Sequence, residues 1–119
     1  MINEEELKEI VDKEYEDKSR LFSELAKYGV AFQTKHFPGE MDSLLKNLDD
    51  DPIYWGGGED GDIAIAKTAV PGLLVVRGDG IKNPYYIPTT KDAKIVVNQL
   101  KIAFGELERV LQQYGTKTR

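Results

Sequence analysis

The chain contains no cysteine, and this absence removes several kinds of chemistry at once. Without thiols there can be no disulfide framework, no thiol nucleophile and no zinc site built on cysteine. Apolar runs are also short, since none approaches the ~20 residues that a membrane-spanning helix needs. The first six residues are acidic where a signal peptide would be basic and then apolar. The sequence therefore predicts a cytoplasmic protein in a reducing compartment, without membrane contact.

Groups suited to acid–base or nucleophilic catalysis are equally scarce. His36 is the only histidine, and no serine signature accompanies it that would complete a nucleophile–base pair. The glycine run 56–58 resembles a phosphate loop only superficially, because it lacks the Gly-Lys-Thr ending and lies among acidic residues. We therefore predict neither enzymatic activity nor a cofactor.

Charge is distributed unevenly along the chain. The net charge is −5, but residues 1–60 hold sixteen Asp or Glu against seven Lys or Arg, and residues 61–119 hold five against nine. The acidic half would repel a polyanionic backbone, so the sequence predicts no binding to nucleic acid. Two interpretations stay open: complementary halves that associate internally or head to tail, or exposed helices that are simply acidic.

Acidic residues flank the glycine run on both sides, at 49–51 and at 59–62. Oxygen-rich loops that contain glycine can hold Ca²⁺ or Mg²⁺. The EF-hand spacing, with a glutamate at its twelfth position, is absent. We therefore interpret this segment as a solvated acidic loop and predict no metal site.

The length of 119 residues suits one domain with one core. Near its start, Asn3 followed by Glu6 forms a capping-box pattern, and the apolar spacing predicts one long helix as far as Tyr28. Gly29 is predicted to end this helix as a left-handed C-cap. A second, short helix is predicted over residues 39–48.

From residue 62 the apolar period becomes that of β-strands. Three strands are predicted over 62–68, 73–77 and 81–88, joined by turns that Pro-Gly and Asp-Gly favour. Residues 73–76 of the middle strand include no polar side chain, so both faces need a cover, from this chain or from a partner subunit. Proline residues in the third strand predict that it lies at a sheet edge.

The strongest pattern in the chain is an apolar seam in its last third. Apolar residues recur at alternating spacings of four and three, at Val96, Leu100, Ala103, Leu107, Val110 and Tyr114. This spacing predicts a long C-terminal helix from about residue 89, of the kind that pairs with another helix. We therefore predict a homodimer or larger homo-oligomer with Leu100 and Leu107 at the contact.

Two aromatic pairs are candidates for contact with a protein partner. Tyr54 and Trp55 adjoin the glycine run, and large aromatic side chains beside a flexible loop are frequent contact anchors. The alternative is a loop that these rings pin to the core. In the pair Tyr85 and Tyr86, strand geometry sends one ring to each face, so one packs inward, and Tyr86 is predicted to meet a partner.

Basic and hydroxyl residues gather in sequence around the start of the predicted C-terminal helix. A helix N-terminus attracts anions through its free N–H groups and its dipole. The predicted site for a small anion or nucleotide phosphate comprises Arg77, Lys82, Thr89, Thr90, Lys91 and Lys94. Asp92 opposes this site, because a carboxylate in the first turn already complements the dipole.

Together these patterns predict an α+β domain over residues 1–119. Its three-stranded antiparallel meander packs with a long N-terminal and a long C-terminal helix, plus one short helix. This order of elements occurs in many unrelated proteins and does not select a function. The leading hypothesis is a non-enzymatic protein-interaction module that acts as a homo-oligomer, an assembly, adaptor or inhibitor protein of the type that phages encode. The alternative is a binding protein for a small anionic ligand such as a nucleotide.

Overall fold

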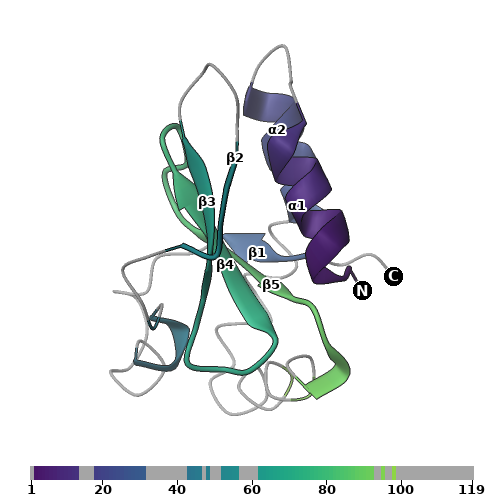
Figure 1. Cartoon of the computed structure of the whole chain (residues 1–119), viewed down its shortest axis with the longest axis vertical. Helices are drawn as coiled ribbons and strands as arrows, with labels where there is room; N and C mark the ends of the chain where they lie inside the picture. The colour runs from purple at the N-terminus through teal and green to yellow at the C-terminus, as the bar shows by residue number, and fades with distance from the viewer. Residues whose placement is uncertain are drawn as a thin grey trace.

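The computed structural model describes residues 2–13, 18–31, 43–46, 48, 52–56, 62–92, 95 and 98. Two helices come first, α1 (Glu4–Asp12) and α2 (Lys18–Ala26). Five strands follow: β1 (Val30–Ala31), β2 (Tyr54–Gly56), β3 (Ile63–Lys67), β4 (Leu73–Gly78) and β5 (Tyr85–Pro88). Figure 1 shows both helices on one side of the sheet. Within these described ranges, no helix combines the length and the apolar character that crossing a membrane requires.

All five strands form one antiparallel sheet in the order β1-β5-β4-β3-β2. The strands β2 to β5 follow one another as a meander, and β1 is added beside β5 at the far edge. The predicted three-stranded sheet is therefore wrong, although its strands correspond to β3, β4 and β5. The two strands left out of the predicted sheet, β2 and β1, hold three and two residues. That is too short for the alternating pattern that reveals a strand, and residues 30–34 suited a short strand and an extended connector equally.

The strand β5 lies between β1 and β4, so the prediction that it forms a sheet edge is wrong. Proline at a ladder position is tolerated only where no neighbouring strand needs its N–H. Here β1 pairs with Tyr85 and Tyr86 alone, so Pro88 lies beyond the end of β1. Pro84 precedes the strand. The shortness of β1 is what allows a proline-containing strand inside the sheet.

The turn between β3 and β4 forms as its sequence predicts. The Leu73 N–H donates to the Val70 carbonyl at 3.0 Å, and Gly72 has φ of 80° at the third position, which defines a type II turn. The buried Thr68 hydroxyl donates to the Leu73 carbonyl at 2.8 Å and fixes the turn from within. A hairpin also forms after β4, but its connection is longer than the turn predicted at residues 78–80, because pairing with β5 stops at Val76 and Tyr85.

The two helices cover one face of the sheet with an apolar layer. Four helical residues are fully buried there: Leu7, Val11, Leu21 and Leu25. The sheet contributes Ile63, Ile65, Leu74, Val76 and Ile87 to the same cluster. Each such side chain stabilises the fold by about 1.5–3 kcal/mol relative to exposure, so this layer is the main core.

The opposite face of the sheet is buried as well. Its buried residues are Ala64, Ala66, Leu73, Val75 and Tyr86, none of them more than 7% exposed. Residues 73–76 of β4 are therefore enclosed on both faces within this one chain, which confirms the prediction made from their lack of polar residues. A partner subunit is not needed to cover β4.

The predicted long N-terminal helix is wrong, because the segment forms two separate helices. The capping box at its start is confirmed: the Glu6 N–H donates to Asn3 Oδ1 at 2.8 Å, and the Asn3 N–H donates to Glu6 Oε1 at 3.2 Å. However, α1 ends at Lys13, which is extended. An unbroken helix over residues 4–28 would be about 38 Å long, whereas the six residues of β4 span about 20 Å. The break keeps both apolar faces on the sheet.

Gly29 follows α2 but does not have the left-handed conformation that was predicted for it, since its φ is not positive. Its N–H donates to the Leu25 carbonyl at 3.1 Å. A Cβ atom at this position would lie 2.5 Å from the Tyr86 carbonyl oxygen and 2.5 Å from Ile87 Cγ1. Glycine is therefore required here because the chain passes directly against β5.

The other two predicted helices fall mostly outside the described residues. Of residues 39–48, Ser43, Leu44 and Leu45 are helical. Of the long C-terminal helix, the structure describes Lys91, Asp92, Ile95 and Asn98, all in helical conformation. The seam residues, including Leu100 and Leu107, lie outside the described part.

We predict that Gly29→Ala lowers the free energy of unfolding by about 1–3 kcal/mol, the usual cost of adding a methyl group to a filled site. The Tyr86 carbonyl is backbone and cannot rotate away, so relief requires β1 to move. Chemical denaturation measures the change. Ser23→Ala, at an exposed position of α2, is the control and should be nearly neutral. A Gly29→Ala protein as stable as the wild type would contradict the proposed packing.

Candidate protein-interaction surface

The strand β2 lies at one edge of the sheet and pairs with β3 alone. Its register places Tyr54 opposite Ile65 and Trp55 opposite Ala64. The Ile53 N–H also donates to the Ile65 carbonyl, at 2.8 Å, although Ile65 already pairs with Tyr54. Two residues of one strand that oppose a single residue of the next form a β-bulge. The bulge ends regular pairing just before β2.

Trp55 is the exposed side chain of this edge strand. Because side chains alternate along a strand, Tyr54 faces the helices with Ile65, and Trp55 faces the opposite side with Ala64. Trp55 is 58% exposed, a large apolar surface in contact with water. Of the two interpretations of this aromatic pair, exposure favours a contact anchor for Trp55, while Tyr54 has the role of pinning the strand.

Tyr54 attaches β2 to α1. The ring lies under the Lys8 ammonium, with 5.6 Å between Nζ and the ring centroid. Desolvation, together with the charge of Asp12 and a hydrogen bond to it, raises the pKa of the Tyr54 phenol above its usual value of 10.0. Two residues further along β2, a Cβ atom on Gly56 would lie 3.1 Å from Val11 Cγ1. The edge strand is thus held closely against the helix, so Trp55 projects from a fixed support.

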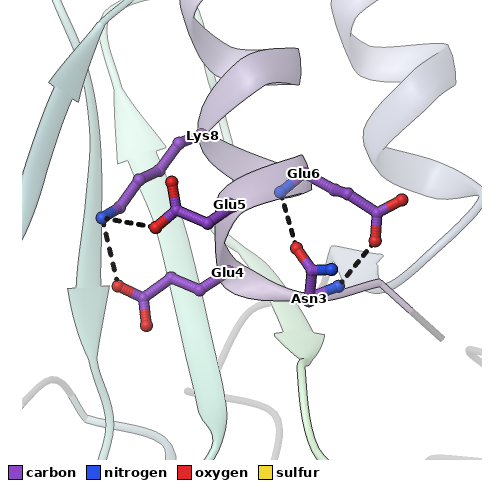
Figure 2. Close-up of polar contacts among 5 residues, drawn as sticks. All are labelled: Asn3, Glu4, Glu5, Glu6 and Lys8. Carbon is purple, nitrogen blue, oxygen red and sulfur yellow. Dashed lines mark hydrogen bonds and ion pairs between the residues drawn. The ribbon is translucent and has the colours of Figure 1, made fainter.

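Lys8 links the start of α1 to this edge. Figure 2 shows its ammonium reaching both Glu4 and Glu5, at 3.3 and 3.6 Å. Hydrogen bonding to Glu4 is the largest cause that raises the pKa of Lys8 above 10.5. One cation is therefore shared by two carboxylates and an aromatic ring, so the flank of α1 beside β2 keeps an excess of negative charge.

The backbone N–H and C=O groups of Trp55 face away from β3, toward the open edge of the sheet. The Asp79 N–H donates to the Asp62 carbonyl at 3.1 Å, outside the pair Ile63–Gly78. That bond makes Ile63–Gly78 a non-hydrogen-bonded pair, so the backbone groups of Ile63 face β2. Because hydrogen-bonding direction alternates along a strand, the N–H and C=O of Ala64 face β4. Trp55 lies opposite Ala64, so its own N–H and C=O face outward from the sheet. No strand of the described part of the chain lies beyond β2.

Among the described residues beside this edge, acidic side chains outnumber basic ones. The Asp12 Cα lies 3.3 Å from the position that a Cβ atom on Gly56 would take. Glu5 lies 3.6 Å from the Lys8 ammonium that covers the Tyr54 ring. We name the β2 edge surface as the combination of the strand Tyr54–Gly56 with Glu5 and Asp12.

The other predicted partner residues are not assembled with Trp55. Tyr86 is only 7% exposed, so its ring is not available to a partner in this conformation, and Tyr85 stacks with Phe22 at a centroid distance of 6.4 Å. Leu100 and Leu107 lie outside the described residues. The β2 edge surface therefore rests on Tyr54 and Trp55 alone among the residues predicted for partner contact.

The residues of the predicted anion site lie at opposite ends of β4. Arg77 and Lys82 flank the turn after this strand, whereas the Thr89 N–H and hydroxyl both donate to the Gly72 carbonyl, each at 2.7 Å, beside the turn before it. Gly72 and Arg77 are five residue steps apart along the strand, about 17 Å. Thr90 lies against Gly72, Lys91 is exposed, and Lys94 lies outside the described residues. The structure does not bring this set together.

The acidic segment considered for a metal ion is described only in part. Asp62 is exposed, and residues 49–51 and 59–61 lie outside the described residues, as does His36. In the described ranges, no three His, Asp or Glu side chains are grouped so that they could hold a metal ion.

A groove between α1 and α2 was not predicted. It encloses about 300 Å³, and its lining residues are Ile2, Glu6, Glu9, Ile10, Lys13, Glu24 and Tyr28. The spacing of Glu6, Glu9 and Lys13 does place them on one side of a helix, but the groove exists because the chain reverses between α1 and α2. Glu6 is engaged in the capping box and Glu24 pairs with Lys27 at 2.9 Å.

Comparisons of the chain with protein-family models, with curated proteins and with solved structures give no match.

We predict that Trp55 emits at long wavelength in the free protein and is readily quenched by acrylamide, a neutral quencher that the local charge does not repel. Trp55→Ala should leave the melting temperature almost unchanged, since little buried area is lost. The control Tyr86→Ala removes a buried ring and should cost about 3–5 kcal/mol. Blue-shifted, protected emission would place Trp55 in the core instead.

We predict that the pKa of Tyr54 lies above 10 in the folded protein and falls when Asp12→Asn removes the nearby charge. Because the unfolded chain loses this proton first, the stability that the tyrosine contributes is present below pH 10 and is lost as the pH rises through its folded pKa. NMR titration of the tyrosine ring carbons measures the shift. Glu9→Gln, on the other side of α1, should leave the pKa unchanged, and an equal effect of both substitutions would contradict the assignment.

Proposed function

We propose that this chain is a non-enzymatic protein-interaction module, an assembly, adaptor or inhibitor protein that occupies a partner's surface through the β2 edge surface. The observation that carries the proposal is the exposure of Trp55, 58% of whose surface faces water. Tryptophan is enriched at the energetic centres of protein interfaces, because it buries a large area with little loss of side-chain freedom. The part of the ring that faces water adds no burial to the core, and it is available for contact.

The support beneath Trp55 fits this role. A contact residue binds more tightly when its backbone is already fixed in the bound conformation. Pairing with β3, the packing of Tyr54 under Lys8, and the close approach of Gly56 to α1 all restrain this three-residue strand. The anionic-ligand alternative receives no such support, because Arg77 and Thr89 lie at opposite ends of β4.

Two further parts of the proposal come from the sequence. We propose a cytoplasmic location, which the absence of cysteine supports. We also propose self-association, which the apolar seam with Leu100 and Leu107 supports. Light scattering of the wild type tests this second part separately, since association through the seam does not depend on Trp55.

The decisive experiment is affinity capture from the native host with three baits: wild type, Trp55→Ala and Ile95→Ala. Ile95 is 55% exposed and serves as the matched control for removal of an exposed apolar side chain. A protein that binds through the edge is retained by the wild type and by Ile95→Ala and is lost from Trp55→Ala. Direct binding with the purified partner should then weaken at least about tenfold, as at an interface hot spot. Equal capture by all three baits would contradict the proposal.

A further inference from the structure

The β2 edge surface combines three features that together specify the chemistry of a partner: outward-facing backbone N–H and C=O groups, an exposed indole and an excess of negative charge. We propose that it binds an extended, lysine- or arginine-rich segment of the partner, which adds as a strand beside β2. This inference rests on the proposed function and names the chemistry of the partner.

The backbone supplies the register. The N–H and C=O of Trp55 face outward, so an added strand can form one hydrogen-bonded pair with this residue. The partner residue in that pair has its side chain on the face of Trp55. Its two neighbours alternate to the other face, where α1 borders the strand. The partner therefore presents alternate side chains to an indole ring and to the acidic flank of a helix.

Charge selects the side chains on both faces. On the helix side, Asp12 lies against Gly56, and Glu5 lies beside the ammonium of Lys8. Lys8 already contacts two carboxylates and the tyrosine ring. A lysine or arginine from the partner can pair with the remaining negative charge. On the other face, a cation above the indole gains the attraction between a positive charge and an aromatic ring, which is strongest for tryptophan. Basic side chains are thus favoured on either face.

The same charges argue against a second copy at this edge. Two β2 strands paired about a two-fold axis would bring together two acidic α1 flanks, each with Glu5 and Asp12. Like charges across strands are destabilising. A neutral or acidic segment would add no positive charge beside Glu5 and Asp12.

The test uses a synthetic ten-residue peptide of alternating lysine and threonine, with three matched peptides. One carries glutamate in place of lysine, one is neutral with glutamine, and one is the lysine peptide with alternate backbone nitrogens methylated on the pairing edge. Binding to the full-length protein is followed by Trp55 fluorescence and by the amide shifts of β2 and β3. Only the lysine peptide should bind, and its affinity should fall as salt is raised.

Variants of the protein separate the contributions. Glu5→Gln with Asp12→Asn should weaken binding of the lysine peptide about fivefold, as expected for two exposed charges. Glu9→Gln, the same change on the groove side of α1, should leave it within about twofold. Trp55→Ala should abolish binding of the lysine peptide, as N-methylation of the peptide backbone should. Far-ultraviolet circular dichroism checks that each variant is folded.

The outcomes distinguish this inference from the proposed function. Equal binding of the lysine and glutamine peptides, or of the methylated peptide, overturns the inference, as does loss of affinity with Glu9→Gln equal to that with the double variant. If no peptide binds while a host protein is still lost from Trp55→Ala, the interaction module stands and its partner is not a basic strand. Self-association of the wild type that Trp55→Ala abolishes would assign the edge to a second copy and overturn the inference.

Discussion

The burial of β4 on both faces is the constraint on which the rest of the structure depends. Its four consecutive apolar residues, 73–76, cannot meet water on either side, so a cover is needed above and below the sheet. The helices α1 and α2 provide one of these layers. The strand therefore lies at the centre of the five-stranded order, with two strands on either side. The strands at the two edges of the sheet, β1 and β2, are short. The candidate contact surface lies on β2, where backbone groups and the Trp55 ring face outward.

The sequence predicts those parts of the fold that have strong local signals. The capping box of Asn3 and Glu6, the turn at Gly72 and the three longest strands depend on neighbouring residues, and all of them form. The missed features depend on contacts between distant segments. The chain breaks between α1 and α2 because two short helices match the length of the strands, whereas one long helix would extend past them. Gly29 looks like a helix stop in sequence, but its requirement comes from Tyr86, which lies far along the chain.

The candidate surface was predictable only in its two aromatic residues, Tyr54 and Trp55. The exposure of Trp55 depends on the register that sets it opposite Ala64, with Tyr54 turned toward the helices. Glu5 and Asp12 had no predicted connection with this strand, because their proximity arises from the packing of α1 on β2. The anion site shows the opposite error. Arg77 and Thr89 are close in sequence, yet an antiparallel hairpin carries the chain back along β4 and leaves them at its two ends.

The pairing of β1 with β5 has a consequence for the order in which the chain folds. Ala31 lies opposite Tyr85, 54 residues later, whereas Val76, on the other side of Tyr85, is nine residues away from it. Loop-closure entropy makes the longer loop roughly 1.6 kcal/mol less favourable to close than the shorter one. Only two residue pairs between β1 and β5 offset this cost. We therefore expect the β3–β4–β5 hairpins to form first and to act as the template on which the N-terminal segment docks. Under mild destabilisation, β1 should separate from β5 before the hairpins open. The least durable contact of the sheet is therefore at the edge opposite Trp55.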